Sequence, residues 1–167
     1  MPKVDRLYVD SNVFILLFEG GGELSDHLAE LFFADRTGRD PFLATSELTI
    51  AELLVDPYRR KDDQLIQTYD NWTRTNDHMT VVPVDRETLR CAAILRAHYE
   101  SIKLPDAIHL SAAIGLCCSH VLTADKRLSG QYELTDHRFG VTGGPVRLDI
   151  LRPEIEVLRH LIEEAAR

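Results

Sequence analysis

The stretch Leu7-Tyr8-Val9-Asp10-Ser11-Asn12, followed by the apolar run 13–18, decides the predicted fold of this 167-residue chain. Three apolar residues that end in an aspartate are typical of a short buried strand. The polar pair Ser11-Asn12 leads into an apolar segment, which the glycines at 20–22 interrupt. The beginning of the chain therefore predicts a strand that ends in a carboxylate and passes into a helix.

The rest of the chain alternates between segments typical of strands and segments typical of helices. Further strands are predicted, from their apolar and β-branched residues, at 41–45, 79–84, 120–123 and 146–150. Helices are predicted at 24–32, 46–55, 62–76 and 86–99, from Pro105 onward, and at 153–166. The pair Asp56-Pro57 is expected to end the helix at 46–55, and residues 129–145, rich in glycine, are expected to form an exposed loop.

This alternation predicts an α/β fold with three layers, α/β/α, around a central and mostly parallel sheet of about five strands. The absence of repeats and low-complexity linkers predicts a single domain over residues 1–167, with a core at about 4–150. The amphipathic C-terminal helix at 153–166 could cover a sheet face, support a dimer or bind a partner.

The composition places the chain among ordinary globular proteins, with 44% hydrophobic and 28% charged residues. The longest nearly uncharged apolar stretch, about 107–118, is too short to span a bilayer, and the N-terminus does not resemble a signal peptide. Three cysteines without a CxxC pair argue against a disulfide framework and give a zinc site little support. We therefore expect a cytoplasmic protein.

Four carboxylates stand where they could meet at one end of the predicted sheet. Asp10 directly follows the first strand, and Asp125 follows the strand at 120–123. Ligands of open parallel sheets bind outside the carboxyl ends of the strands. Asp106 lies at the start of a helix and Glu52 lies in a helix that follows a strand, so both could join the same group.

Carboxylates brought together repel one another unless cations neutralise them, so the cluster predicts a site for Mg²⁺ or Mn²⁺. Such a site could hold a phosphodiester. The formal net charge of −8 is unusual for a protein that binds nucleic acid. Bound divalent cations would, however, make the site itself electropositive.

Each acid also has a purely structural interpretation. Asp10 and Asp125 could be helix N-caps, and Thr49 with Glu52 matches the capping-box pattern. Asp106 in the first turn of a helix interacts favourably with the helix dipole. Taken one at a time, these positions are weak indications of a site.

Four motifs in order resemble those of PIN-domain proteins, particularly the VapC-type toxins of bacteria and archaea. They are Leu7-Tyr8-Val9-Asp10-Ser11-Asn12-Val13-Phe14-Ile15, Thr45-Ser46-Glu47-Leu48-Thr49-Ile50-Ala51-Glu52-Leu53-Leu54, Leu104-Pro105-Asp106-Ala107-Ile108-His109-Leu110-Ser111-Ala112-Ala113 and Val121-Leu122-Thr123-Ala124-Asp125-Lys126-Arg127-Leu128. The similarity covers about residues 4–128.

This resemblance implies a PIN fold and a metal-dependent endoribonuclease. The family's acidic catalytic and metal-binding positions fall on Asp10, Glu52, Asp106 and Asp125, and its supporting polar positions fall on Asn12 and Thr123. In the second motif Glu52, before the apolar pair Leu53-Leu54, is preferred over Glu47. His109, three residues after Asp106, is interpreted as a hydrogen-bonded histidine on a packed helix rather than as a ligand or base.

The functional hypothesis is a ribonuclease that hydrolyses RNA with Mg²⁺ or Mn²⁺, as the toxin of a type II toxin–antitoxin pair. It implies an RNA substrate, a small antitoxin partner and a homodimer. Two alternatives stay open. The chain could be a PIN-domain nuclease of RNA processing that is not a toxin, or a PIN-fold binding module without catalysis.

Overall fold

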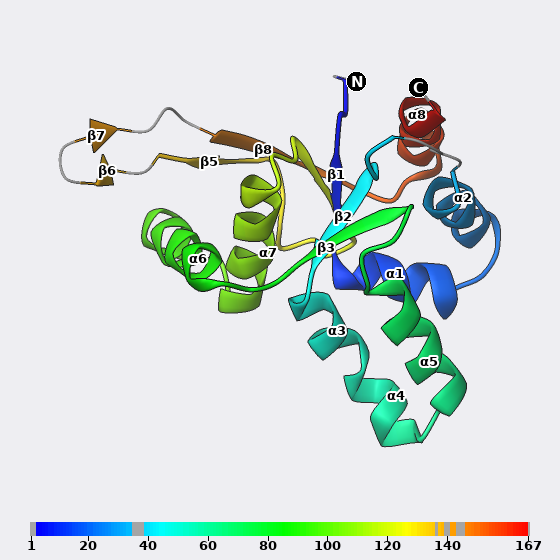
Figure 1. Ribbon diagram of the computed structural model, residues 1–167. Coiled ribbons are helices and arrows are strands. Elements are labelled where there is room, and N and C mark those ends of the chain that lie inside the picture. Colours follow the sequence, from blue (N-terminus) through cyan, green and yellow to red (C-terminus); the bar gives the residue numbers. More distant parts are fainter. Residues whose placement is uncertain (1–2, 35–38, 136, 139–140, 143–145, 167) are drawn as a thin grey trace.

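The central sheet of the computed structural model has six strands in the order β3-β2-β1-β4-β8-β5 (Figure 1). The structure describes residues 3–34, 39–135, 137–138, 141–142 and 146–166. The strands are, in sheet order, Met79–Val82, Leu43–Ser46, Leu7–Val9, His120–Leu122, Val146–Leu151 and Gln131–Leu134. All neighbouring pairs are parallel except β5 with β8. The predicted α/β fold with a mostly parallel sheet is confirmed.

The strand β5 corrects the sequence prediction, which treated residues 129–145 as a loop. Gln131–Leu134 pairs antiparallel with β8, and Tyr132 and Leu134 are buried while Gln131 and Glu133 are exposed. This alternation is the period of a strand with one covered face, but four residues are too short a run to stand out. A small hairpin of β6 (His137–Arg138) and β7 (Val141–Thr142) follows. The glycines at 140, 143 and 144 lie outside the described residues.

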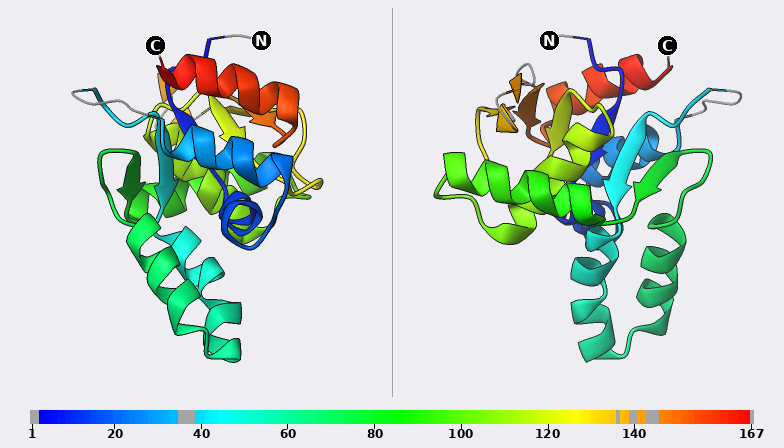
Figure 2. Two further views of the ribbon diagram at one scale, coloured as in Figure 1. Left: turned by 90° about the vertical axis from the view of Figure 1, so that its right-hand side faces the viewer. Right: turned by 60° about the vertical axis from the view of Figure 1, so that its left-hand side comes forward.

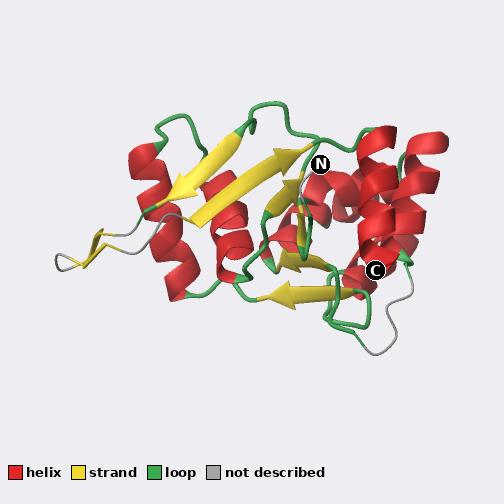
Figure 3. Ribbon diagram, turned by 90° about the horizontal axis from the view of Figure 1, so that it is seen from above, coloured by secondary structure: helices red, strands yellow, loops and turns green. Residues whose placement is uncertain are grey.

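Helices cover both faces of the sheet, as Figure 3 shows from above. Leu7 and Val9 of β1 face a core formed with α1 (Ser11–Phe18), α2 (Glu23–Phe32) and α8 (Ile155–Ala166). Tyr8 points to the opposite core, with α6 (Arg86–His98) and α7 (Leu104–Gly115). The alternation of side chains along β1 thus assigns its neighbours to two separate cores.

The C-terminal helix α8 covers the first of these sheet faces. It lies beside α2 (Figure 1), and Leu158, Leu161 and Ala165 are buried in the core that contains Val9 of β1. Of the three roles considered for this helix, covering the sheet is the one that the structure shows. No helix in the described part of the chain is long and apolar enough to cross a membrane.

A helical arm projects from the carboxyl ends of the strands (Figures 1 and 2). It consists of α3 (Leu48–Leu53), α4 (Val55–Arg60) and α5 (Asp63–Trp72). The prediction that Asp56-Pro57 ends the helix was wrong, because Pro57 lies in the first turn of α4. The N–H groups of a first helical turn have no partner within the helix, so proline loses nothing there. The arm turns at Lys61, and the Asp62 carboxylate caps α5 through the Leu65 N–H at 3.0 Å.

Candidate active site

Asp10 lies where the strand order of the sheet reverses. It follows β1, with β2 and β3 on one side and β4 and β8 on the other. The Asp10 N–H donates to the carbonyl of Leu122, the last residue of β4, at 3.1 Å. Asp10 is 7% exposed. Its carboxylate therefore stands at the strand-order switch, the position at which parallel α/β sheets bind ligands.

Donors from three residues fix the Asp10 carboxylate. The Ser11 N–H donates to Oδ1 at 2.7 Å, while Asn12 Nδ2 and the Thr123 hydroxyl donate to Oδ2 at 2.5 and 2.6 Å. Asn12 Oδ1 accepts from the Ala124 N–H at 2.7 Å, which ties the start of α1 to the loop after β4. Asp10 is thus an N-cap of α1, and Asn12 and Thr123, the predicted supporting residues, both donate to its carboxylate.

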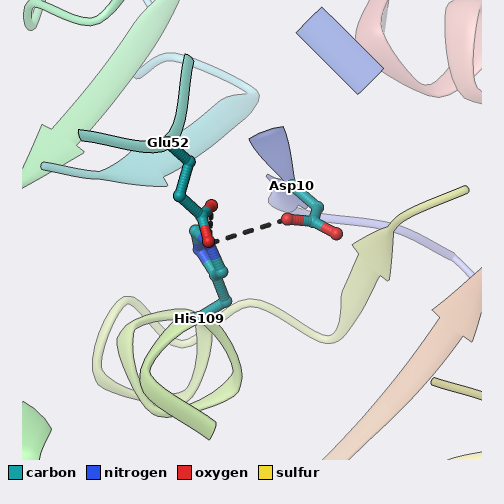
Figure 4. A group of neighbouring side chains, drawn as sticks. All are labelled: Asp10, Glu52 and His109. Atoms are coloured by element: carbon teal, nitrogen blue, oxygen red, sulfur yellow. Dashed lines mark hydrogen bonds and ion pairs between the residues drawn. The ribbon is translucent and has the colours of Figure 1, made fainter. Parts of the chain in front are cut away.

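His109 joins Asp10 to Glu52 (Figure 4). Its Nε2 lies 2.8 Å from Glu52 Oε2 and 3.6 Å from Asp10 Oδ1. Ligand atoms of the three residues all lie within 4.8 Å of one another. His109 is buried on α7 and Glu52 is partly exposed on α3, so a helix on one sheet face and the arm beyond the strand ends both contribute to this cluster.

On its other side His109 is held by buried hydroxyl groups. The Tyr8 hydroxyl lies 2.9 Å from His109 Nδ1 and 2.8 Å from Ser46 Oγ. Tyr8 is fully buried, and burial raises the pKa of its hydroxyl, so it stays protonated. The imidazole is therefore anchored by β1 and β2 and directs Nε2 at the carboxylates.

The pKa shifts of His109 and Glu52 favour an ion pair between the two side chains. Burial lowers the pKa of His109, but the hydrogen bond with Glu52 and the charges of Asp10, Glu52 and Asp106 together raise it above its ordinary value. Burial also opposes ionisation of Glu52, yet the hydrogen bond and charge of His109 hold the Glu52 pKa below its usual range. The contact thus favours a positive charge on His109 and a negative charge on Glu52.

The competing interpretations of the second motif are resolved by position. Glu52 is the fifth of the six residues of α3 and faces His109, and α3 has no side-chain cap at its N-terminus. Glu47 is the exposed residue that precedes α3. The capping-box interpretation of Glu52 is therefore wrong, and of the two glutamates only Glu52 faces the cluster.

Asp106 and Asp125 form a second group, with Arg127 between them. Nε of Arg127 lies 3.0 Å from both carboxylate oxygens of Asp125, and its Nη2 contacts Asp125 and lies 4.0 Å from Asp106 Oδ2. The hydrogen bond from Arg127 lowers the pKa of Asp125. Burial raises the pKa of Asp106, with Arg127 opposing and the charges of Asp125 and Asp10 reinforcing the rise. Asp125 makes a turn with the Arg127 N–H rather than a helix cap.

The structure thus brings the four predicted acids into one electrostatic cluster, divided between His109 and Arg127. His109 had been favoured as a structural residue, and its contacts with two acids add it to the site. The signal was available in the sequence, because a spacing of three puts Asp106 and His109 on the same side of a helix. No sequence pattern indicated that Tyr8 and Ser46 contribute to the site, because residues of short buried strands are expected to be part of the core.

Residues 7–134 match the PIN domain. The chain belongs to the PIN domain family. A search of curated proteins finds no match. The predicted resemblance to PIN-domain proteins is confirmed.

Solved structures of toxin–antitoxin complexes share this fold. A toxin–antitoxin complex from Klebsiella pneumoniae is 22% identical with a TM-score of 0.52, covering 72% of this chain and 86% of the other. VapBC2 from Rickettsia felis, bound to a DNA fragment from its promoter, is 16% identical with a TM-score of 0.53. The match covers 71% of this chain and 86% of the other. At these identities the likeness shows the fold.

The residues present suit a divalent cation. Two carboxylates and an imidazole nitrogen converge within 4.8 Å, from side chains that are buried or partly buried. Oxygen ligands suit Mg²⁺ and Mn²⁺, and an imidazole adds affinity for transition metals, Mn²⁺ among them. The hydrogen bond from the far ring nitrogen of His109 to Tyr8 is the kind that orients a metal-binding histidine.

Proposed function

We propose that this PIN domain is a metal-dependent endoribonuclease. The observation that carries the proposal is the convergence of Asp10, Glu52 and His109 at the point where the strand order reverses, with Asp106 close enough for its charge to affect His109. Buried acids at a strand-order switch are costly for a fold without a cation or ligand to neutralise them.

Asp10, Glu52 and His109 would hold the cation, with His109 offering Nε2 in its deprotonated form. A bound Mg²⁺ or Mn²⁺ would lower the pKa of water and neutralise charge on the phosphate. The imidazole favours Mn²⁺ of the two. Asn12 and Thr123 keep Asp10 in place by donating to Oδ2, so that only limited rearrangement is needed when the cation binds.

The reaction would be hydrolysis of an RNA phosphodiester. Water adds to phosphorus, the bond from phosphorus to the 3′ oxygen breaks, and the departing oxygen takes a proton. The products are a 5′-phosphate and a 3′-hydroxyl. Asp106 and Asp125 lie beside the group of Asp10, Glu52 and His109, where they would add negative charge to the site.

The biological role that we propose is that of a toxin in a type II toxin–antitoxin pair. Its support is the likeness of the fold to two solved toxin–antitoxin complexes together with the motif resemblance. A small antitoxin would block the acidic site, and the toxin would act in the cytoplasm as a homodimer. An RNA-processing nuclease that is not a toxin is the nearest alternative.

The enzymatic proposal is tested by incubating single-stranded RNA with the protein and Mn²⁺, Mg²⁺ or EDTA. We expect cleavage with either cation and none with EDTA. Asp10→Asn should reduce cleavage by about 100-fold or more while the circular dichroism spectrum stays unchanged. Asp56→Asn, an exposed aspartate on α4, is the matched control. Full cleavage by Asp10→Asn, or no cleavage by the wild type with either cation, would contradict the proposal.

The toxin role is tested separately by induced expression in bacteria. Growth should stop with the wild type and continue with Asp10→Asn. Co-expression of a small protein encoded beside the gene should restore growth. Cleavage in vitro without growth arrest would favour the RNA-processing alternative, whereas neither effect would favour a binding module without catalysis.

A further inference from the structure

Arg127 is a cation already present within the acidic site. Its guanidinium spans the two oxygens of Asp125 through Nε at 3.0 Å, and its Nη2 lies 4.0 Å from Asp106 Oδ2. The Arg127 N–H donates to Asp125 Oδ1 at 2.9 Å as well. One residue therefore occupies both carboxylate oxygens of Asp125, in the bidentate geometry that guanidinium and carboxylate groups favour.

The two halves of the cluster differ in what neutralises them. Ligand atoms of Asp10, Glu52 and His109 come within 4.8 Å of one another, and none of these acids contacts an arginine among the described residues. Asp106 and Asp125 instead face a permanent positive charge. A metal ion that used Asp125 as a ligand would first have to displace the guanidinium.

The guanidinium of Arg152 holds the backbone of the loop that carries Arg127. Arg152 donates through Nη1 to the carbonyls of Thr123 and Asp125 at 2.9 and 2.7 Å, and through Nη2 to the carbonyl of Leu128. The backbone around Arg127 is thereby held, while the Arg127 side chain is 56% exposed. A guanidinium has five N–H groups, so donors remain for an anion that approaches from solvent.

We infer that Arg127 takes the place of a second metal ion. It neutralises Asp106 and Asp125, offers its remaining N–H groups to the phosphate of the RNA, and limits the site to one divalent cation at Asp10, Glu52 and His109. This inference rests on the proposed function, because it assigns that site one metal ion and one arginine.

The number of bound Mn²⁺ ions tests the inference without RNA or activity. Equilibrium dialysis, with free Mn²⁺ read by electron paramagnetic resonance, should give one ion for the wild type and two for Arg127→Gln. The double variant Arg127→Gln/Asp125→Asn should return to one. Arg147→Gln, an exposed arginine paired with Glu133 at 3.5 Å on β8, should bind one ion and serves as the control. Thermal unfolding verifies that each variant is folded.

A second measurement addresses the phosphate contact. In EDTA, where no cleavage occurs, Arg127→Gln should bind a single-stranded RNA oligonucleotide about tenfold more weakly than the wild type. Arg147→Gln should bind within about twofold. Equal RNA affinity of wild type and Arg127→Gln would overturn the assigned phosphate contact.

The outcomes separate the two proposals. Two ions on the wild type, or one ion on both the wild type and Arg127→Gln, would overturn the role of Arg127 and leave the metal-dependent nuclease intact. Failure of the wild type to bind any Mn²⁺ would overturn the proposed function and this inference together.

Discussion

His109 on α7 and Glu52 on α3 are hydrogen-bonded through Nε2 and Oε2 at 2.8 Å, although 57 residues separate them in the sequence. This contact closes the site from two sides, because α7 packs on one face of the sheet and the arm that begins with α3 extends from the strand ends. Asp10, 3.6 Å from the same nitrogen, completes the group. Substitutions of Glu52, Tyr8, Tyr69 and Leu161 test this arrangement and the fold that supports it.

Glu52→Gln should weaken Mn²⁺ binding by about tenfold or more, because the amide keeps the shape of the side chain but removes its charge. Glu47→Gln, on the exposed residue before α3, is the matched control and should bind Mn²⁺ within about twofold of the wild type. Isothermal titration calorimetry measures both. Mn²⁺ affinity of Glu52→Gln within about twofold of the wild type would show that Glu52 is not a ligand.

Tyr8→Phe should disturb His109 without touching a carboxylate. The variant removes the hydroxyl between His109 Nδ1 and Ser46 Oγ and leaves two buried polar atoms without it. We expect a loss of about 1–3 kcal/mol in the free energy of unfolding and about tenfold weaker Mn²⁺ binding.

The control for Tyr8→Phe is Tyr69→Phe, another buried tyrosine whose hydroxyl bonds Glu19 at 2.6 Å. It should also lose stability but should keep Mn²⁺ affinity. Nitrogen-15 chemical shifts of the His109 ring should change in Tyr8→Phe alone. Unchanged shifts and unchanged Mn²⁺ affinity would assign Tyr8 a purely structural role.

Tyr69→Phe should also make stability less dependent on acid pH. The hydrogen bond from Tyr69, followed by the pairing with Arg60 at 2.6 Å, holds the pKa of Glu19 below its usual value although burial opposes this. A carboxyl whose folded pKa is depressed stabilises the protein above its unfolded pKa, about 4.3, and loses that contribution as pH falls through the folded pKa.

The difference in unfolding free energy between wild type and Tyr69→Phe should therefore be about 1 kcal/mol at pH 7 and should shrink below about pH 4. Urea denaturation at a series of pH values measures it. A difference that stays constant down to pH 3 would mean that Glu19 ionisation is not linked to the Tyr69 hydroxyl.

Leu161→Ala should destabilise the fold by about 2–5 kcal/mol, because Leu161 is fully buried where α8 covers the sheet. Glu163→Ala, on an exposed position of the same helix, should change stability by about 0.5 kcal/mol or less. Urea unfolding compares the two. Similar small effects would indicate that α8 is not part of the folded core of the free protein.

The fold was largely predictable because its parallel strands are short, apolar and followed by helices with regular apolar spacing. The two errors have local causes. β5 is a four-residue edge strand at the start of a glycine-rich segment, so its alternation is too brief to outweigh that composition. A proline breaks a helix when it lies in the helix interior but is tolerated in the first turn. The sequence did not reveal that a new helix begins at Val55, which places Pro57 in a first turn.

The sequence by itself indicated which acids stand at strand ends, and in a parallel sheet such ends lie at the same edge, so Asp10 and Asp125 were expected there. Only the tertiary structure decided how these acids are neutralised. His109 meets Glu52 and Asp10, whereas Arg127 holds Asp125 and approaches Asp106. The reason is physical: periodicity fixes which face a side chain occupies, but a hydrogen bond between distant segments depends on strand order, helix packing and rotamers, which are set only when the chain folds.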